Sequence, residues 1–167
     1  MNSKLALILF AAFFTSSLSL LAQDNLPSVM LEKDNGSNVN ILDAVKDKDL
    51  TIIDFWATWC IPCRHELENI SDVYADWQDE WNMQLIAVSI DDAKTKSQVM
   101  PYINGKGYDY KVLLDPNSEF FLAVNGLTPP LTLIVDKNGH ILFIHHGYIE
   151  GDEYELEDFM SGWFKKN

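Results

Sequence analysis

The sequence predicts one α/β domain, built on a mixed central sheet with helices on both faces. Strand-like and helix-like segments alternate along the chain, which is typical of this class. Two segments, 50–57 and 83–90, are apolar at nearly every position, as parallel strands covered on both faces should be. The chain has 167 residues, 47% of them hydrophobic, which is enough for one domain with a sizeable core.

Residues 1–22 have the pattern of a secretory signal peptide, and the domain is predicted to span 23–167. A basic start at Lys4 precedes an unbroken apolar run over 5–14, and 15–22 is smaller and more polar. Cleavage is expected at the end of this segment. The alternative is an uncleaved membrane anchor, but a span needs about 20 apolar residues, and the serines that follow the apolar run weaken that interpretation.

The first half of the domain is predicted to hold a hairpin, a short helix, a central strand and a long helix. The turn sequence Asp34-Asn35-Gly36 indicates the hairpin, and β-branched and aromatic residues indicate the central strand. Apolar residues recur at helical spacing in the long helix, which predicts a core stripe rather than a ligand-binding aromatic box. That stripe comprises Leu67, Ile70, Val73, Tyr74, Trp77 and Trp81. In chain order the strands are 29–31, 39–41 and 50–57, and the helices are 42–46 and 60–81.

The second half continues the alternation of strands and helices. The turn Asp136-Lys137-Asn138-Gly139 predicts a hairpin near the end, and the last helix is amphipathic. Its inner face is expected to carry Tyr154, Leu156, Phe159 and Trp163. The predicted strands are 83–90, 110–114, 131–135 and 141–145, and the predicted helices are 94–104, 118–124 and 151–164.

The central strand runs directly into Cys60-Ile61-Pro62-Cys63, at the start of the long helix. Residues at i and i+3 of a first helical turn have Cα atoms about 5 Å apart, within disulfide range. Free helix N–H groups and the positive end of the helix dipole favour a thiolate on the first sulfur. Pro62 is tolerated there because a first-turn N–H has no helical acceptor to lose. The spacing therefore indicates a redox-active pair.

Two other uses of these cysteines are less favoured. A purely structural disulfide would close so small a loop that it would add little stability. A structural zinc site needs four ligands, and the chain holds only two cysteines. For the same reason His65, His140, His145 and His146 are interpreted as surface or strand residues rather than metal ligands.

The segment 55–67, F-W-A-T-W-C-x-P-C-R-x-E-L, resembles the thioredoxin superfamily, specifically its exported TlpA/ResA-like branch. The resemblance extends from about Leu26 to Lys166. It implies a thioredoxin-like fold with an added N-terminal β-hairpin and an inserted αβ segment at about 91–115. It also implies a thiol–disulfide oxidoreductase that needs no diffusible cofactor, because the two cysteines carry the electrons.

The two cysteines are assigned different roles. Cys60 is predicted to be the nucleophile, because it precedes the helix, should be the more exposed sulfur and gains most from the helix terminus. Attack on a substrate disulfide would give a mixed disulfide at Cys60. Cys63, one turn deeper, would then attack Cys60 and release the reduced substrate.

Two carboxylates are candidates for adjusting this chemistry. Asp54 stands in an otherwise apolar strand and aligns with the buried aspartate of thioredoxin, so burial should raise its pKa and make it the base for Cys63. The alternative is an exposed strand end. Glu66 matches the family's glutamate three residues after the second cysteine, which influences thiol acidity and substrate choice. The alternative for Glu66 is a solvated helix carboxylate.

Residues around the cysteines and at a later proline turn are expected to contact the substrate. Pro130 aligns with the family's cis-proline, six residues before Asp136, although a cis bond at Pro129 is the alternative. Pro129 has no N–H, so one strand-type hydrogen bond to a bound peptide should be missing. Trp56 is expected to pack in the core. The substrate-contacting set is Trp59, Ile61, Pro62, Pro129 and Pro130.

The predicted function is reduction of disulfides in exported cysteine-containing proteins, in the bacterial periplasm and with a role in cytochrome c maturation as one possibility. The resemblance implies a membrane thiol electron donor of the DsbD/CcdA type. Alternatives on the same fold are a thiol peroxidase and an SCO-like copper carrier. The first needs T-x-x-C, whereas Thr58 stands two residues before Cys60, and the second needs C-x-x-x-C.

The charge of the chain argues against two kinds of partner. The formal net charge is −13, and it becomes −14 without residues 1–22, whose one charged side chain is Lys4. Such acidity argues against nucleic acid and against anionic membrane surfaces. It is typical of a soluble exported protein.

Overall fold

A computed structural model describes residues 25–167, and the predicted signal peptide at 1–22 lies outside this range. The described chain forms a seven-stranded sheet in the order β2-β1-β5-β4-β3-β6-β7. The strands are β1 (Met30–Lys33), β2 (Asn38–Asn40), β3 (Leu50–Trp56), β4 (Met83–Ser89), β5 (Lys111–Leu114), β6 (Leu131–Asp136) and β7 (Ile141–His146). β3, β4 and β5 are parallel, whereas β6 pairs antiparallel with β3 and β1 pairs antiparallel with β5. The predicted mixed sheet is confirmed.

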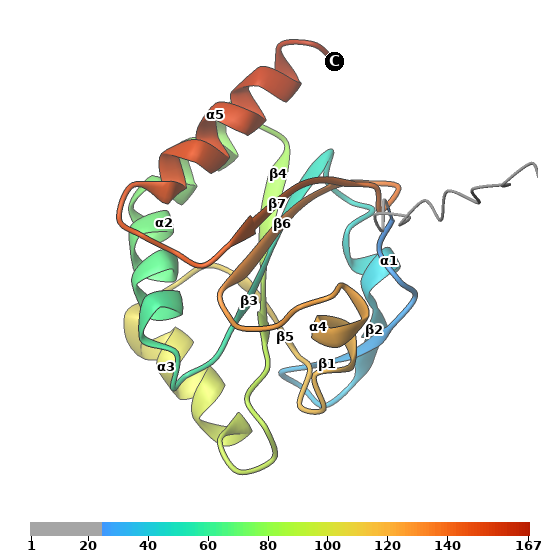
Figure 1. The fold of residues 1–167 in the computed structure, drawn as a ribbon, viewed down its shortest axis with the longest axis vertical. Helices are drawn as coiled ribbons and strands as arrows, with labels where there is room; N and C mark the ends of the chain where they lie inside the picture. Colours follow the sequence, from blue (N-terminus) through green and yellow to red (C-terminus); the bar gives the residue numbers. More distant parts are fainter. Residues whose placement is uncertain (1–24) are drawn as a thin grey trace, which may run out of the picture.

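Helices cover both faces of this sheet. They are α1 (Ile41–Ala44), α2 (Ile61–Glu80), a 3₁₀ turn η1 (Lys96–Gln98), α3 (Val99–Lys106), α4 (Glu119–Ala123) and α5 (Asp152–Phe164). In Figure 1, α2, α3 and α5 lie on one side of the sheet, and α1 and α4 lie on the other. Every helix within the described part of the chain is too short or too polar to span a bilayer.

The central strand β3 is buried along its whole length and divides its side chains between the two helical layers. Phe55 packs on Phe120 and Phe121 at α4, with ring centroids 4.9 and 5.3 Å away. Trp56 packs instead on Tyr102 of α3, at 5.5 Å. Because side chains alternate along a strand, Asp54 faces the same layer as Trp56. β3 therefore directs a carboxyl group toward the side that carries α2.

The element boundaries differ from the sequence predictions mainly between β4 and β5. The predicted helix 94–104 is a 3₁₀ turn followed by α3, which begins at Val99. Pro101 explains this start, because it then lies in the first turn of α3, where its missing N–H costs no helical hydrogen bond.

The inner face of α5 also needs a correction. Tyr154 was expected to face the core but is 60% exposed. Leu156 is buried, as predicted, and Glu153 and Met160 are buried as well. Phe159 and Trp163 are partly buried and pack against the core, as predicted.

Candidate active site

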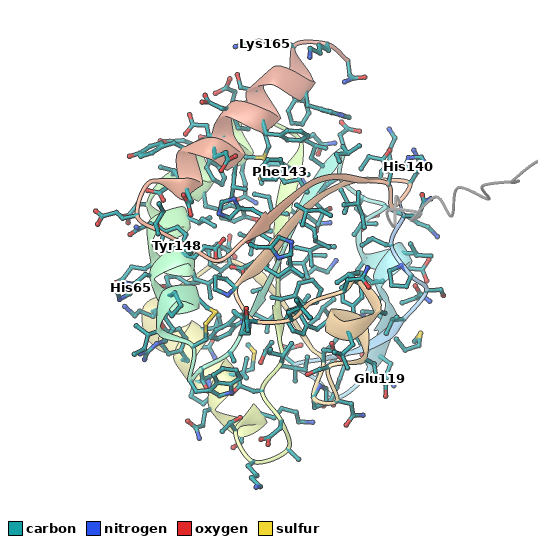
Figure 2. The ribbon with its side chains drawn as sticks, in the orientation of Figure 1. His65, Glu119, His140, Phe143, Tyr148 and Lys165 are labelled. Carbon is teal, nitrogen blue, oxygen red and sulfur yellow. A yellow bond between two sulfur atoms is a disulfide. The ribbon has the colours of Figure 1, made fainter. Side chains whose placement is uncertain are left out.

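Cys60 and Cys63 form a disulfide at the start of α2, with their Cα atoms 5.4 Å apart. Cys60 is the N-cap residue in an extended conformation, and its Sγ accepts a hydrogen bond from the Cys63 N–H at 3.3 Å. Pro62 lies in the first turn, as predicted. Cys60 is 5% exposed and Cys63 is fully buried. Figure 2 shows the sulfur–sulfur bond at the end of α2 that lies near the labelled His65.

A buried aspartate that the sequence analysis missed anchors the segment leading into Cys60. Asp91 is 1% exposed and follows β4. Its Oδ2 accepts hydrogen bonds from the Thr58 N–H at 2.8 Å and the Ser89 hydroxyl at 2.9 Å, and its Oδ1 accepts from the Thr58 hydroxyl at 2.6 Å. One feature of the sequence could have identified Asp91, namely that this acid directly follows a predicted parallel strand. The carboxyl ends of adjacent parallel strands lie at the same edge of the sheet, so an acid at this position is placed near the end of β3. Asp91 thereby fixes the backbone two residues before the nucleophile candidate.

Replacing Asp91 with alanine is expected to destabilise the oxidised protein by about 3 kcal/mol, because the buried Ser89 hydroxyl and the partly buried N–H and hydroxyl of Thr58 lose their acceptor. It should also speed alkylation of Cys60 in the reduced protein, since release of the preceding loop uncovers this nearly buried residue. Urea unfolding and iodoacetamide kinetics measure the two effects. Asp92→Ala is the matched control. Asp92 is the next residue along the chain, and its exposed carboxylate accepts hydrogen bonds from the N–H groups of Lys94 and Thr95. Equal stability of both variants would contradict the anchoring role.

Asp54 and Glu66 are both buried, so neither is the exposed carboxylate that the alternatives described. Asp54 is 0% and Glu66 is 2% exposed. Burial raises the pKa of Asp54 well above its ordinary value, and the nearby charge of Glu66 adds to this. Burial also raises the pKa of Glu66, to about 8, although the Thr132 hydroxyl donates to Glu66 Oε1 at 2.6 Å and opposes the shift. The site therefore holds two carboxyl groups that keep their protons at pH values above those at which Asp and Glu side chains ordinarily ionise.

The proline turn places a cis peptide bond between Pro129 and Pro130, that is, before Pro130 and not before Pro129. Pro130 is buried, and its carbonyl accepts a hydrogen bond from the Gly147 N–H at 2.9 Å. Pro129 is partly exposed. The turn leads directly into β6, which pairs with β3. The position preceding the cis-proline therefore has no N–H to offer to a bound peptide.

The surface beside the disulfide combines exposed apolar side chains with a hollow. Trp59 and Ile61 are 56% and 58% exposed on either side of Cys60, whereas Trp56 is buried, as predicted. A cavity of about 490 Å³ lies along the first turns of α2 and the loop after β7. It is lined by Pro62, His65, Glu68, Asn69, Tyr148, Ile149 and Glu150. Figure 2 shows His65 and Tyr148 on this side of the molecule.

One of the four histidines is part of a charged cluster. His65, His140 and His146 are exposed. His145 is partly buried on β7, with Nε2 3.0 Å from Asp152 Oδ2 and Nδ1 3.2 Å from Glu155 Oε2. The two carboxylates belong to the first turn of α5, so this cluster ties the last strand to the last helix.

The fold and the site define a class. A C-x-x-C disulfide at the N-terminus of a helix, beside a buried carboxyl group and next to a strand that begins at a cis-proline, is the arrangement of a thioredoxin-like thiol–disulfide oxidoreductase. The chain belongs to the AhpC/TSA family, whose sequence profile matches residues 22–144. The predicted membership of the thioredoxin superfamily is confirmed.

Individual relatives agree with this class. A thioredoxin-like protein from Porphyromonas gingivalis, solved in solution, is 43% identical with a TM-score of 0.76, over 87% of this chain and 94% of that one. Thiol-disulfide oxidoreductase ResA from Bacillus subtilis is 24% identical over 92% of this chain and 82% of its own length. StoA from Bacillus subtilis has a similar fold, with a TM-score of 0.64 at 19% identity over 82% of this chain and 98% of its own.

Proposed function

We propose that this protein reduces disulfide bonds in exported proteins through its Cys60–Cys63 pair. The observation that carries the proposal is the position of Cys60 at the N-cap of α2, with the Cys63 N–H directed at its sulfur. N–H groups directed at a sulfur stabilise the thiolate over the thiol, and the thiolate is the attacking species. In the reduced protein, Cys60 Sγ is therefore the sulfur that attacks the substrate.

The reaction follows from the unequal burial of the two sulfurs. The Cys60 thiolate attacks a substrate disulfide, forms a mixed disulfide and displaces one substrate sulfur as a thiolate. Cys63 then loses its proton and attacks Cys60 Sγ, so that the second substrate sulfur leaves and the Cys60–Cys63 bond forms. Two electrons move from the protein to the substrate. Because Cys63 is fully buried, a substrate reaches Cys60 first.

The proton of Cys63 needs an acceptor inside the protein. Cys63 and Glu66 lie on the same buried face of α2, one turn apart. Asp54 faces them from β3, and burial raises the pKa values of both carboxyl groups, to about 8 for Glu66, so that both can hold a proton at neutral pH. Asp54 and Glu66 are proposed as the acid–base groups of the site. Trp59, Ile61, Pro62, Pro129 and Pro130 are proposed to hold the substrate segment.

Location and partners are part of the proposal. The pattern of residues 1–22 supports export into the periplasm, and so does the resemblance of segment 55–67 to the exported TlpA/ResA-like branch. Electrons would come from a membrane thiol carrier of the DsbD/CcdA type, and apocytochrome c is one candidate among the exported substrates. The high negative charge suits neither nucleic acid nor an anionic membrane.

Two assays test this function. The purified protein should catalyse reduction of a disulfide-bonded peptide by dithiothreitol, and a Cys63→Ser variant expressed in the native host should retain exported partners as mixed disulfides on Cys60. Capture of exported cysteine proteins supports the proposal. Consumption of peroxide without disulfide reduction would replace it with a thiol peroxidase, and stoichiometric retention of Cu(I) would replace it with a copper carrier.

Pro129 offers a separate test of how a substrate segment binds. Pro129→Ala restores an N–H at the position before the cis bond, where an extended peptide could accept it. One additional hydrogen bond should tighten binding of a cysteine-containing peptide to a Cys63→Ser background by about 2- to 10-fold. Isothermal calorimetry measures it. Ala123→Ser, in α4, is a control that leaves this edge unchanged, and an unaltered Kd for Pro129→Ala would refute peptide pairing at this position.

A further inference from the structure

Two buried carboxyl groups and one buried hydroxyl meet under α2. Thr132 of β6 lies directly opposite Asp54 of β3 in the antiparallel register, so both side chains stand on the same face of the sheet. Glu66 reaches this face from α2, because the Thr132 hydroxyl donates to its Oε1 at 2.6 Å. All three side chains are buried. The three groups belong to three different elements and form one polar cluster beneath the disulfide helix.

The two carboxyl groups of the cluster differ in their hydrogen-bond donors. Within residues 25–167, neither oxygen of Asp54 has a hydrogen-bond partner, and Glu66 Oε2 has none either. Glu66 Oε1 alone has a donor. A hydrogen bond to an anion stabilises the charged form, and a buried carboxylate without a donor is costly. Ionisation of Glu66 therefore costs less free energy than ionisation of Asp54.

The other titratable groups around the cluster do not reverse this order. On α5, the carboxylates of Asp152 and Glu153 repel a charge on Glu66. The hydroxyl of Tyr110 donates to the Leu67 carbonyl at 2.7 Å, and that of Tyr148 donates to Glu153 Oε2 at 2.7 Å. Each hydroxyl has a single proton to donate, so these two tyrosines supply no donor to Asp54. On α2 itself, Cys63 is bonded to Cys60 in this oxidised form.

We infer that Thr132 is a positioning residue that directs the first ionisation of the cluster, as the pH rises, to Glu66 and leaves the proton on Asp54. The charge of Glu66 is one of the causes that raise the pKa of Asp54, after burial, and this is what the order requires. Ionised Glu66 then also holds the proton on Asp54 by charge repulsion. This modifies the sequence-based expectation that Asp54 is the base for Cys63.

The assignment divides the proton chemistry between two residues, and this consequence rests on the proposed reductase function. When a donor thiolate attacks Cys60 Sγ, the electron pair of the S–S bond leaves on Cys63, and protonated Asp54 supplies the proton that this sulfur takes up. In the opposite direction, ionised Glu66 accepts the Cys63 proton before Cys63 attacks a mixed disulfide, and this proton then passes to Asp54, which restores the starting protonation of both carboxyl groups. One group acts as the acid and the other as the base.

The test is a pH titration of the oxidised protein labelled with ¹³C at its Asp and Glu carboxyl carbons, followed by NMR. Glu66 should ionise first, near pH 8, and Asp54 only at higher pH. Thr132→Val keeps the side-chain shape but removes the hydroxyl, and should move the Glu66 transition upward by about 1 to 2 pH units. Thr132→Ser should restore it. Thr51→Val is the matched control, because Thr51 is buried in β3 but its hydroxyl bonds Gln84.

Ionisation of Asp54 before Glu66 would overturn the inference, and so would an unmoved Glu66 transition in Thr132→Val. Should Thr132→Val fail to fold, Glu66→Gln gives the second test, because the Asp54 transition should then move down once the neighbouring charge is gone. An unmoved Asp54 transition would also overturn it. The titration uses the disulfide form and needs no substrate, so its result is separate from the outcome of the reductase assay.

Discussion

Cys60→Ser is expected to reduce the disulfide-reductase activity to the background rate of dithiothreitol alone. A serine hydroxyl is not ionised at neutral pH and its oxygen cannot exchange with a disulfide, so the first step of the reaction has no nucleophile. The variant should still fold, because Cys60 caps α2 and serine is a favoured N-cap residue. A peptide-reduction assay with matched circular dichroism spectra measures both properties.

Cys63→Ser is the matched comparison, and it is expected to trap the substrate rather than simply to lose activity. Turnover should stop, but each molecule should still make one attack and retain the substrate as a mixed disulfide on Cys60. The difference arises because Cys63 is fully buried behind a slightly exposed Cys60. Capture by Cys60→Ser, with none by Cys63→Ser, would show that the two sulfurs have the opposite roles.

The second large effect is a loss of stability as the pH rises, caused by Glu66. Its pKa is raised by burial from an ordinary 4.5 to about 8 in the folded protein. Between these values the unfolded chain has released a proton that the folded protein still holds. The contribution of Glu66 to the free energy of unfolding should therefore be greatest below pH 4.5 and fall by about 1.4 kcal/mol per pH unit as the pH rises toward 8. Glu66→Gln is neutral at every pH and should remove this slope.

Urea unfolding of the oxidised protein at pH 5, 6, 7 and 8 measures the difference between wild type and Glu66→Gln. Asp54 contributes a slope of the same sign, because its pKa is also raised, and the part of this contribution that burial causes remains in the variant. Glu68→Gln is the control on the same helix, since the hydrogen bond and ion pair with Lys106 lower the pKa of this exposed carboxylate, which therefore adds no slope of this sign. Parallel curves for wild type and Glu66→Gln would contradict the buried, protonated state of Glu66.

The parts of the molecule that could be predicted from sequence are those that neighbouring residues determine. Cys60 caps α2 because the strand before it, the proline after it and the apolar helical stripe all lie within 30 positions along the chain. The hairpin at Asp136-Lys137-Asn138-Gly139 formed as predicted for the same reason. The family resemblance added the position of the cis bond at Pro130.

The parts that could not be predicted depend on contacts between distant residues. A carboxylate at position 66 was equally compatible with solvent or with the core, and the deciding partner, Thr132, stands 66 residues later. Asp91 and Thr58 are 33 residues apart and meet only because β3 and β4 are parallel neighbours. Tyr154 fits the helical period of α5, but the side of α5 that faces the core is set by its packing on α2 and β7.

The most direct test of the redox function is an equilibrium titration of the purified protein against mixtures of reduced and oxidised dithiothreitol. Alkylation followed by mass spectrometry would report the states of Cys60 and Cys63. The two thiols should appear and disappear together in one reversible two-electron transition. If either sulfur kept the same state across the whole range of mixtures, the protein would not be a thiol–disulfide oxidoreductase of the kind described.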